Sequence, residues 1–212
     1  MGKASRGQKN DFEKQKILFF SSEKFMREGF YKTSMDSLAT ELQMSKKTIY
    51  KHFSSKEELV ETVVKSFMTQ VKDKINSVIE EEDNSLIRAF HLFEIMIEVT
   101  TKFSDKWIKD IRIHLPELWE TIDEFRTKRA YAVLGSIIQQ GQKEGIIIEK
   151  PADLIIHLYV TAMRSIVNPD FLYYQKMSYK EAIQDTFEIL FNGILTPNGR
   201  KQFKKSFYTV LK

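Results

Sequence analysis

The sequence lacks cysteine and is poor in the residues that interrupt helices. Among its 212 residues there are 4 prolines, 8 glycines and no cysteine. Without cysteine the chain has neither disulfides nor thiolate-bound metal, which is typical of proteins in reducing compartments, so we expect a cytoplasmic protein. Few prolines and glycines leave long stretches in which a helix can continue unbroken.

Long hydrophobic runs and enzyme motifs are also missing. The polar first 16 residues have no apolar core of the kind found in a secretory signal peptide. The two most apolar stretches, 86–99 and 154–167, are interrupted by charged and histidine side chains, so we expect no membrane contact. There is no glycine-rich phosphate loop, no His-Glu-x-x-His motif and no cysteine nucleophile. We therefore expect a protein that is not an enzyme and has no catalytic residues, no metal and no cofactor.

Helical periodicity runs through the chain. Apolar residues recur at helical spacing beyond residue 56, and no alternating strand pattern of any length competes with it. The sequence therefore predicts an all-α protein. The helices are expected near residues 56–79, 84–102, 104–114, 117–143, 152–168, 179–195 and 199–210.

Positive charge is concentrated at the N-terminal end. Residues 1–56 contain 12 Lys or Arg against 6 Asp or Glu, a net charge of +6, whereas the remaining residues carry −2. Phosphate contacts supply most of the sequence-independent affinity of DNA-binding proteins. A basic segment joined to a near-neutral remainder indicates a chain that contacts a nucleic-acid backbone at one end.

The segment 33–58 predicts two short helices joined by a tight turn, with a third helix behind them. Thr33 and Asp36 have the spacing of a capping box, and Ser45 is the expected N-cap of the second helix. In that second helix Ile49 and Phe53 share one face, and the other faces are polar and cationic. This is the layout of a helix-turn-helix DNA reader, although a solvated basic face is an alternative for the isolated helix.

A second capping box, Ser55 with Glu58, opens the third helix. The whole stretch from about residue 16 to residue 64 resembles the DNA-binding domain of the TetR family of bacterial transcriptional regulators. The family usually has Gly where this chain has Gln43, and a left-handed backbone there costs a non-glycine residue on the order of 1 kcal/mol. The matching residues are Gly29, Phe30, Thr33, Ser34, Met35, Asp36, Leu38, Ala39, Ser45, Thr48, Ile49, Tyr50, His52, Phe53, Lys56, Glu57 and Leu59.

The resemblance implies the domain organisation and the DNA contacts. It implies an N-terminal arm and three-helix helix-turn-helix domain over residues 1–55. Residues 56–212 then form a helical bundle for effector binding and dimerisation. The phosphate candidates are Ser34, Tyr50, His52 and Lys56, the base-reading candidates are Lys46, Lys47 and Thr48, and Ser45 and Lys51 complete the candidate interface.

A second stretch, from Trp107 to Phe125, resembles one group of TetR-like regulators in which Pro-Glu-Leu-Trp leads into the long central helix. In that family the central helices surround a small-molecule pocket. Aromatic residues at helical spacing also suit a plain hydrophobic core, so both interpretations stay open for each residue. The candidate pocket residues are Phe90, Phe93, Ile97, Trp107, Ile111, Trp119, Ile122 and His157.

Three polar residues share one side of the apolar helix expected at 152–168, namely His157, Arg164 and Asn168. They could face the pocket, pair across a dimer axis or contact water. In the family the last two major helices pair with their copies in a second subunit.

Together these features predict a DNA-binding transcriptional regulator, a repressor by resemblance, that binds a double-stranded operator as a homodimer and is released by an unidentified small-molecule effector. The alternative is a TetR-like DNA-binding protein without a small-molecule ligand, which a protein partner controls or which acts constitutively.

Overall fold

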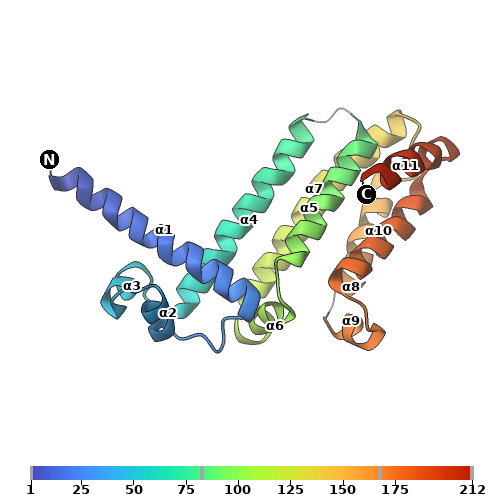
Figure 1. Ribbon diagram of the computed structural model, residues 1–212. Coiled ribbons are helices and arrows are strands. Elements are labelled where there is room, and N and C mark those ends of the chain that lie inside the picture. The colour runs from blue at the N-terminus through green and yellow to red at the C-terminus, as the bar shows by residue number, and fades with distance from the viewer. Residues whose placement is uncertain (1, 82–83, 167–168, 211–212) are drawn as a thin grey trace. The chain divides into compact units, whose positions relative to one another are not determined.

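The computed structural model describes residues 2–81, 84–166 and 169–210, and these residues are almost entirely helical (Figure 1). The expected all-α fold is confirmed. Within the described ranges the only β interaction is an antiparallel bridge between Ile147 and Leu195. The helices are α1 (Gly2–Glu28), α2 (Met35–Glu41), α3 (Lys46–His52), α4 (Lys56–Glu81), α5 (Ser85–Thr101), α6 (Asp105–His114), α7 (Pro116–Lys143), α8 (Ala152–Ile166), α9 (Pro169–Gln175), α10 (Tyr179–Ile194) and α11 (Pro197–Val210).

The expected helices from residue 56 onward are all present, with bounds that differ by a few residues. α9 is not among the expected helices. Proline suits the first position of a helix, where its missing N–H loses no hydrogen bond, and α9 begins at Pro169. None of the described helices is long and apolar enough to cross a membrane.

The N-caps differ in detail from those expected. The start of α2 is capped by Ser34 rather than Thr33: the Ser34 hydroxyl accepts from Ser37 N at 3.0 Å, and Ser34 N donates to Ser37 Oγ at 3.2 Å. At α4 the Ser55 hydroxyl accepts from Glu58 N as expected. The Glu58 carboxylate, however, accepts from the backbone and hydroxyl of Ser54. Two adjacent serines therefore share the cap at α4.

The chain divides into two compact units. Unit 1 comprises residues 1–70 and 102–122. Its core joins α1, α2, α3 and the first half of α4 with α6, whose Trp107 stacks on Phe25 at 6.2 Å. The buried apolar residues of this core are Ile17, Phe25, Met26, Phe30, Met35, Leu38, Ala39, Leu42, Ile49, Phe53, Leu59, Val60, Val63, Val64, Trp107, Ile111 and Leu118.

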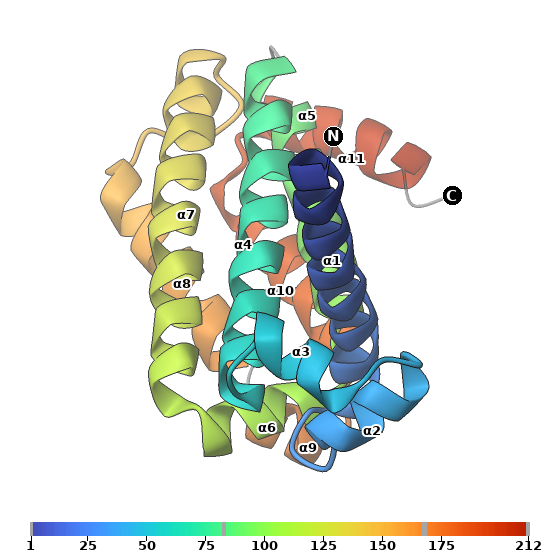
Figure 2. The ribbon, with the colours of Figure 1, turned by 90° about the vertical axis from the view of Figure 1, so that its left-hand side faces the viewer.

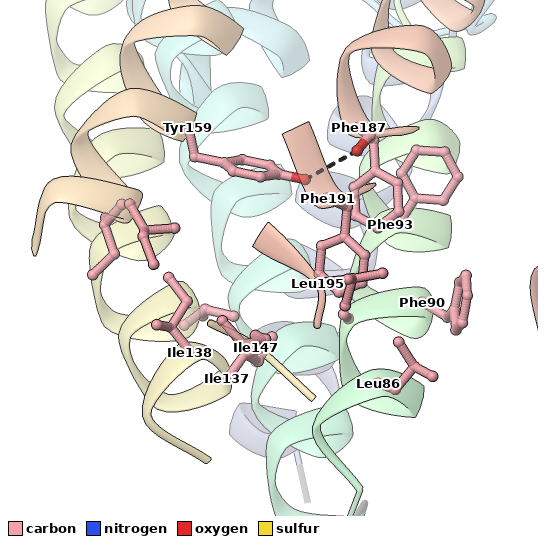
Figure 3. Close-up of a cluster of buried hydrophobic side chains, with 14 of the residues drawn as sticks. Leu86, Phe90, Phe93, Ile137, Ile138, Ile147, Tyr159, Phe187, Phe191 and Leu195 are labelled. Atoms are coloured by element: carbon pink, nitrogen blue, oxygen red, sulfur yellow. Dashed lines mark hydrogen bonds between the residues drawn. The ribbon is translucent and has the colours of Figure 1, made fainter. Parts of the chain in front are cut away.

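Unit 2 comprises residues 71–101 and 123–212. Within it α10 packs against both α5 and α8. Aromatic rings fill the space between them, with Phe93 stacked on Phe187 at 4.2 Å and Phe187 on Phe191 at 5.0 Å (Figure 3). The Tyr159 hydroxyl donates to the Phe187 carbonyl at 3.4 Å, and burial raises the pKa of Tyr159 above its ordinary value.

The boundaries of the two compact units differ from the domain boundary predicted between residues 55 and 56. Residues 56–70 and 102–122 pack with the first 55 residues in unit 1, and α4 and α7 each contribute to both units. The division into a DNA-binding domain over 1–55 and an effector and dimerisation domain over 56–212 is a functional one and stays a prediction.

Candidate nucleic-acid interface

The turn between α2 and α3 is short and closed by backbone hydrogen bonds. Gln43 N donates to Thr40 O at 3.1 Å, and Met44 N donates to Ala39 O at 2.9 Å. Gln43 has a φ of 54°, so the left-handed conformation that the turn requires is adopted here by a residue with a side chain. Gln43 is exposed, so its side chain has room, and a glutamine here costs only the strain of the left-handed backbone.

One face of α3 anchors it to unit 1. Ile49 and the C-cap residue Phe53 are buried against the core formed by α1, α2 and α4. α1 also contacts the end of α3 directly: the Lys14 ammonium lies over the Phe53 ring, 5.8 Å from its centroid. Figures 1 and 2 show α2 and α3 together beside α1. The helix is therefore held on its inner side and presents its other sides to solvent.

The outer face of α3 is polar, cationic and accessible. Lys47, Tyr50 and Lys51 are exposed, and neither lysine takes part in an ion pair with any described residue. Lys46 is exposed too, but its ammonium pairs with the Asp36 carboxylate of α2 at 2.5 Å. At the N-terminus the Ser45 hydroxyl accepts from Thr48 N at 3.0 Å and lies 2.8 Å from Thr48 Oγ1. This cap places two hydroxyls and two lysines at the first turn of α3.

Three candidate phosphate contacts are engaged within the chain. The side chain of His52 is only 3% exposed, and its Nε2 lies 3.4 Å from the Glu13 carboxylate of α1. The Lys56 ammonium donates to the carbonyl oxygens of Tyr31 at 3.0 Å and of Phe30 at 3.4 Å. Ser34 caps α2. These positions favour structural roles for His52 and Lys56, and their contacts with DNA stay predictions.

The loop that leads into α2 is held by α6, a feature that the sequence reasoning missed. The buried Asp110 carboxylate accepts a hydrogen bond from Tyr31 N at 2.9 Å, and the Tyr31 ring stacks on His114 at 3.8 Å. Gly29, with a φ of +77°, lies directly against Asp110. The sequence signal for this contact is Asp110, an acidic residue on the inner face of the short amphipathic helix α6.

The candidate pocket residues fall into two groups. Trp107, Ile111, Trp119 and Ile122 belong to the hydrophobic cluster of unit 1, where Trp107 and Ile111 are buried. Phe90, Phe93 and Ile97 belong to the cluster of unit 2. Within each unit the buried members serve as core, which was the alternative interpretation, and an effector pocket formed by them stays a prediction.

The polar residues of α8 have partners inside the chain. His157 is exposed, and its Nδ1 lies 3.1 Å from the Tyr131 hydroxyl of α7. The Arg164 guanidinium pairs with the Asp123 carboxylate of α7. Asn168, the third member of this set, lies outside the described residues. His157 and Arg164 thus have partners without a pocket ligand or a second subunit.

Histidine and carboxylate side chains do not gather into a metal site in the part of the chain that the structure describes. The capping carboxylate of Glu58 is stabilised as an anion. Its hydrogen bonds from the hydroxyl and then the backbone of Ser54 lower the pKa of Glu58 below its ordinary value. The interface therefore combines a capped helix pair with exposed cations.

Comparisons with known proteins agree with this geometry. Residues 21–63 match the family described as bacterial regulatory proteins, tetR family. The uncharacterized HTH-type transcriptional regulator YvaF of Bacillus subtilis (strain 168) is 24% identical over 172 residues, which cover 81% of this chain and 90% of that protein.

Two solved structures show the same fold. A TetR-family transcriptional regulator from Agrobacterium tumefaciens superposes with a TM-score of 0.66 at 14% identity and covers 88% of this chain and 100% of its own. A putative transcriptional regulator from Saccharomonospora viridis in complex with choline superposes with a TM-score of 0.65 at 17% identity, covering 86% and 97% respectively.

Proposed function

We propose, since the chain belongs to the tetR family of bacterial regulatory proteins, that it represses transcription by binding a double-stranded operator as a homodimer and leaves the DNA when a small-molecule effector binds. The observation that carries the proposal is the outer face of α3, which is accessible, cationic and fixed from behind by Ile49 and Phe53. A bacterial operator lies in the cytoplasm, where the protein would act.

We assign the DNA contacts from the side-chain hydrogen-bond donors of α3 that can reach DNA. Lys47 and Thr48 lie in the first turn, the part of a recognition helix that reaches base edges in the major groove. Tyr50 and Lys51 are exposed further along α3 and suit contacts with phosphates on either side of the groove. Lys46 can reach DNA only by exchanging its Asp36 partner for a base or phosphate.

An operator selected from random double-stranded DNA allows a direct test by fluorescence anisotropy. Replacing Lys51 with alanine should weaken binding to all sequences and reduce the slope of log affinity against log salt by about 0.9, one phosphate's worth. Replacing Lys47 should instead change the preferred sequence. Lys65→Ala, an exposed lysine of α4, is the matched control and should bind like the original protein. If Lys47→Ala and Lys51→Ala also bind unchanged, α3 is not the recognition helix.

The proposed dimer interface lies on α8 and α10. Leu154 and Leu158 are one turn apart on α8 and exposed, and Ile189 of α10 is exposed as well. Apolar faces of this kind on paired helices mark an association surface. Leu158 is 57% exposed and Ile113 of α6 is 58% exposed, so Leu158→Arg and Ile113→Arg form a matched pair. Sedimentation velocity should give a monomer for the first variant and a dimer for the second. Two dimers would place the interface elsewhere.

Effector release requires a small-molecule site and helices that contribute to both units. The choline complex of the Saccharomonospora viridis neighbour supports a small ligand, and α4 and α7 run through both units. A ligand that binds one arrangement of these helices better shifts the population toward it. Thermal-shift screening of cationic and hydrophobic compounds should find a stabilising ligand, worth about 2.7 kcal/mol at a concentration of 100 Kd. That ligand should then lower operator affinity, and a tight ligand without this effect would contradict effector release.

A further inference from the structure

Unit 1 contains a cleft that belongs neither to the outer face of α3 nor to the candidate effector residues. It lies between α1 and the first half of α4 and has a volume of about 430 Å³. Sites for small organic ligands have volumes of roughly 300–1,000 Å³. Figure 1 shows α1 crossing the N-terminal part of α4. The cleft is therefore large enough for a compound and lies entirely within one compact unit.

The apolar surface of the cleft comes from both helices. Leu18 and Met26 of α1 and Val63 and Phe67 of α4 line it. Phe19 also lines it and is 72% exposed, so most of its ring faces solvent in the free protein. A ligand with a flat apolar body would cover this ring and remove its apolar surface from water.

The polar groups of the cleft favour an anion. Among the lining residues, Arg27 and Lys102 are cationic and Glu23 is the one carboxylate. Arg27 uses its Nε and one Nη2 hydrogen on Glu28, at 3.2 and 2.7 Å, so three of its five N–H donors remain for a ligand. The Ser22 hydroxyl donates to the Met26 sulfur, 3.7 Å away, which is a weak acceptor. Its hydroxyl is available for a stronger hydrogen bond.

We propose that this cleft binds an amphipathic organic anion, a compound with an aromatic or acyl body and a carboxylate or sulfonate head. The body lies against Phe19 and Phe67, and the head lies near Arg27. Such a ligand bridges α1 and α4, the two helices that hold α3 from behind. The site is separate from the proposed effector pocket and does not depend on repression or dimerisation.

Titration of the full chain with anilinonaphthalene sulfonate, an aromatic anion that fluoresces in apolar surroundings, tests the proposal. Phe19→Ala should weaken binding about fivefold, because it removes the exposed aromatic wall. Phe12→Ala is the matched control: Phe12 is 70% exposed on the same helix but does not line the cleft, and its replacement should leave binding unchanged. Arg27→Gln should weaken binding about threefold, and Lys65→Gln, which also removes a cation paired with a glutamate on its own helix, should not.

A neutral probe separates the contribution of the charge. Phenylnaphthylamine has the same rings without the sulfonate, and Arg27→Gln should not alter its binding. Ser66→Phe, which fills the cleft from the α4 side, should abolish binding of both probes while far-UV circular dichroism shows retained helix. Absence of binding by the unaltered chain overturns the proposal. Equal binding by the Phe19→Ala, Arg27→Gln and Ser66→Phe variants overturns it too, because the probe then binds elsewhere.

Discussion

Replacing Gly29 with alanine is expected to lower the free energy of unfolding of unit 1 by about 2–4 kcal/mol. Gly29 ends α1 with its amide donating to Phe25 O at 2.8 Å, and its φ of +77° lies in the left-handed region. A Cβ at this position would lie 2.5 Å from Asp110 Oδ2 and 2.9 Å from Lys106 Cγ. Non-bonded atoms do not approach so closely, so Asp110 or the α1–α2 loop has to move.

The magnitude follows from two separate costs. The left-handed conformation costs an alanine about 1–2 kcal/mol, and the reduced freedom of the unfolded chain returns about 0.4–1 kcal/mol. Moving Asp110 breaks its hydrogen bond with Tyr31 N. A bond to a charged group contributes about 1.5–3 kcal/mol, and Asp110 is buried, so solvent replaces it poorly. The second cost is the larger one.

Gly145→Ala separates the two costs. Gly145 also has a left-handed backbone, with a φ of +67°, but a Cβ there meets no atom within 4 Å. Its replacement should cost about 1 kcal/mol, from backbone strain alone. Urea denaturation measures both: Trp107 and Trp119, the two tryptophans of the chain, lie in unit 1 and report its unfolding by fluorescence. Far-UV circular dichroism follows the helices of both units, so a loss seen by circular dichroism but not by fluorescence belongs to unit 2. Equal losses for the two variants would refute the argument that Asp110 is displaced.

Three further outcomes can be measured on the same unfolding curves. Gln43→Gly should raise the stability of unit 1 by about 0.5 kcal/mol, because glycine relieves the left-handed strain at the cost of more freedom in the unfolded chain, and an unchanged or lower midpoint would contradict this. Glu181→Gln should reduce stability at neutral pH, and the stabilities of the variant and the original protein should converge in acid. Hydrogen bonds from the backbone and then the hydroxyl of Ser178 lower the pKa of Glu181. The carboxylate therefore contributes its full stability above the ordinary pKa of 4.5 and loses it as pH falls through the lowered pKa. Burial raises the pKa of Tyr159 in the folded protein, so above about pH 10 this hydroxyl ionises only in the unfolded chain. The original protein should therefore lose stability above about pH 10, and Tyr159→Phe should lack this loss. A similar alkaline slope in both proteins would assign the loss to other tyrosines.

Local features of the helix-turn-helix could be predicted because they depend on neighbours in sequence. Ser45 as the cap of α3, Ile49 and Phe53 as its buried side, and strain at Gln43 all follow from spacing and backbone chemistry within a few residues. The cap of α2 lies one residue after the expected Thr33, and at α4 Ser54 shares the cap with the expected Ser55, since adjacent serines and threonines offer similar hydroxyls. Backbone geometry determines which of two adjacent residues caps the helix, and this geometry cannot be predicted from the sequence.

The assignment of aromatic residues to cores could not be predicted, because it depends on distant segments. Trp107 and Phe93 both have the spacing of inward-facing helical residues. Trp107 stacks on Phe25, more than eighty positions earlier, and so joins the core of unit 1. Phe93 stacks on Phe187 in unit 2. Periodicity identifies the buried face of a helix, but the partner of that face is set by the packing of the whole unit.

The same limit applies to motif residues, and it changes which side chains we expect on DNA. His52 and Lys56 match a family motif, but their acceptors are Glu13 and the carbonyls of residues 30 and 31, which lie far upstream in the sequence. A donor that must give up such a partner gains less from a phosphate than a solvated one, because the lost intramolecular bond offsets the new contact. Lys47 and Lys51 form no ion pair with described residues and lose only hydration and side-chain freedom on binding. Operator affinity should therefore depend more on Lys51 than on Lys56, and the salt slope should fall for Lys51→Ala while Lys56→Ala acts first on the stability of unit 1.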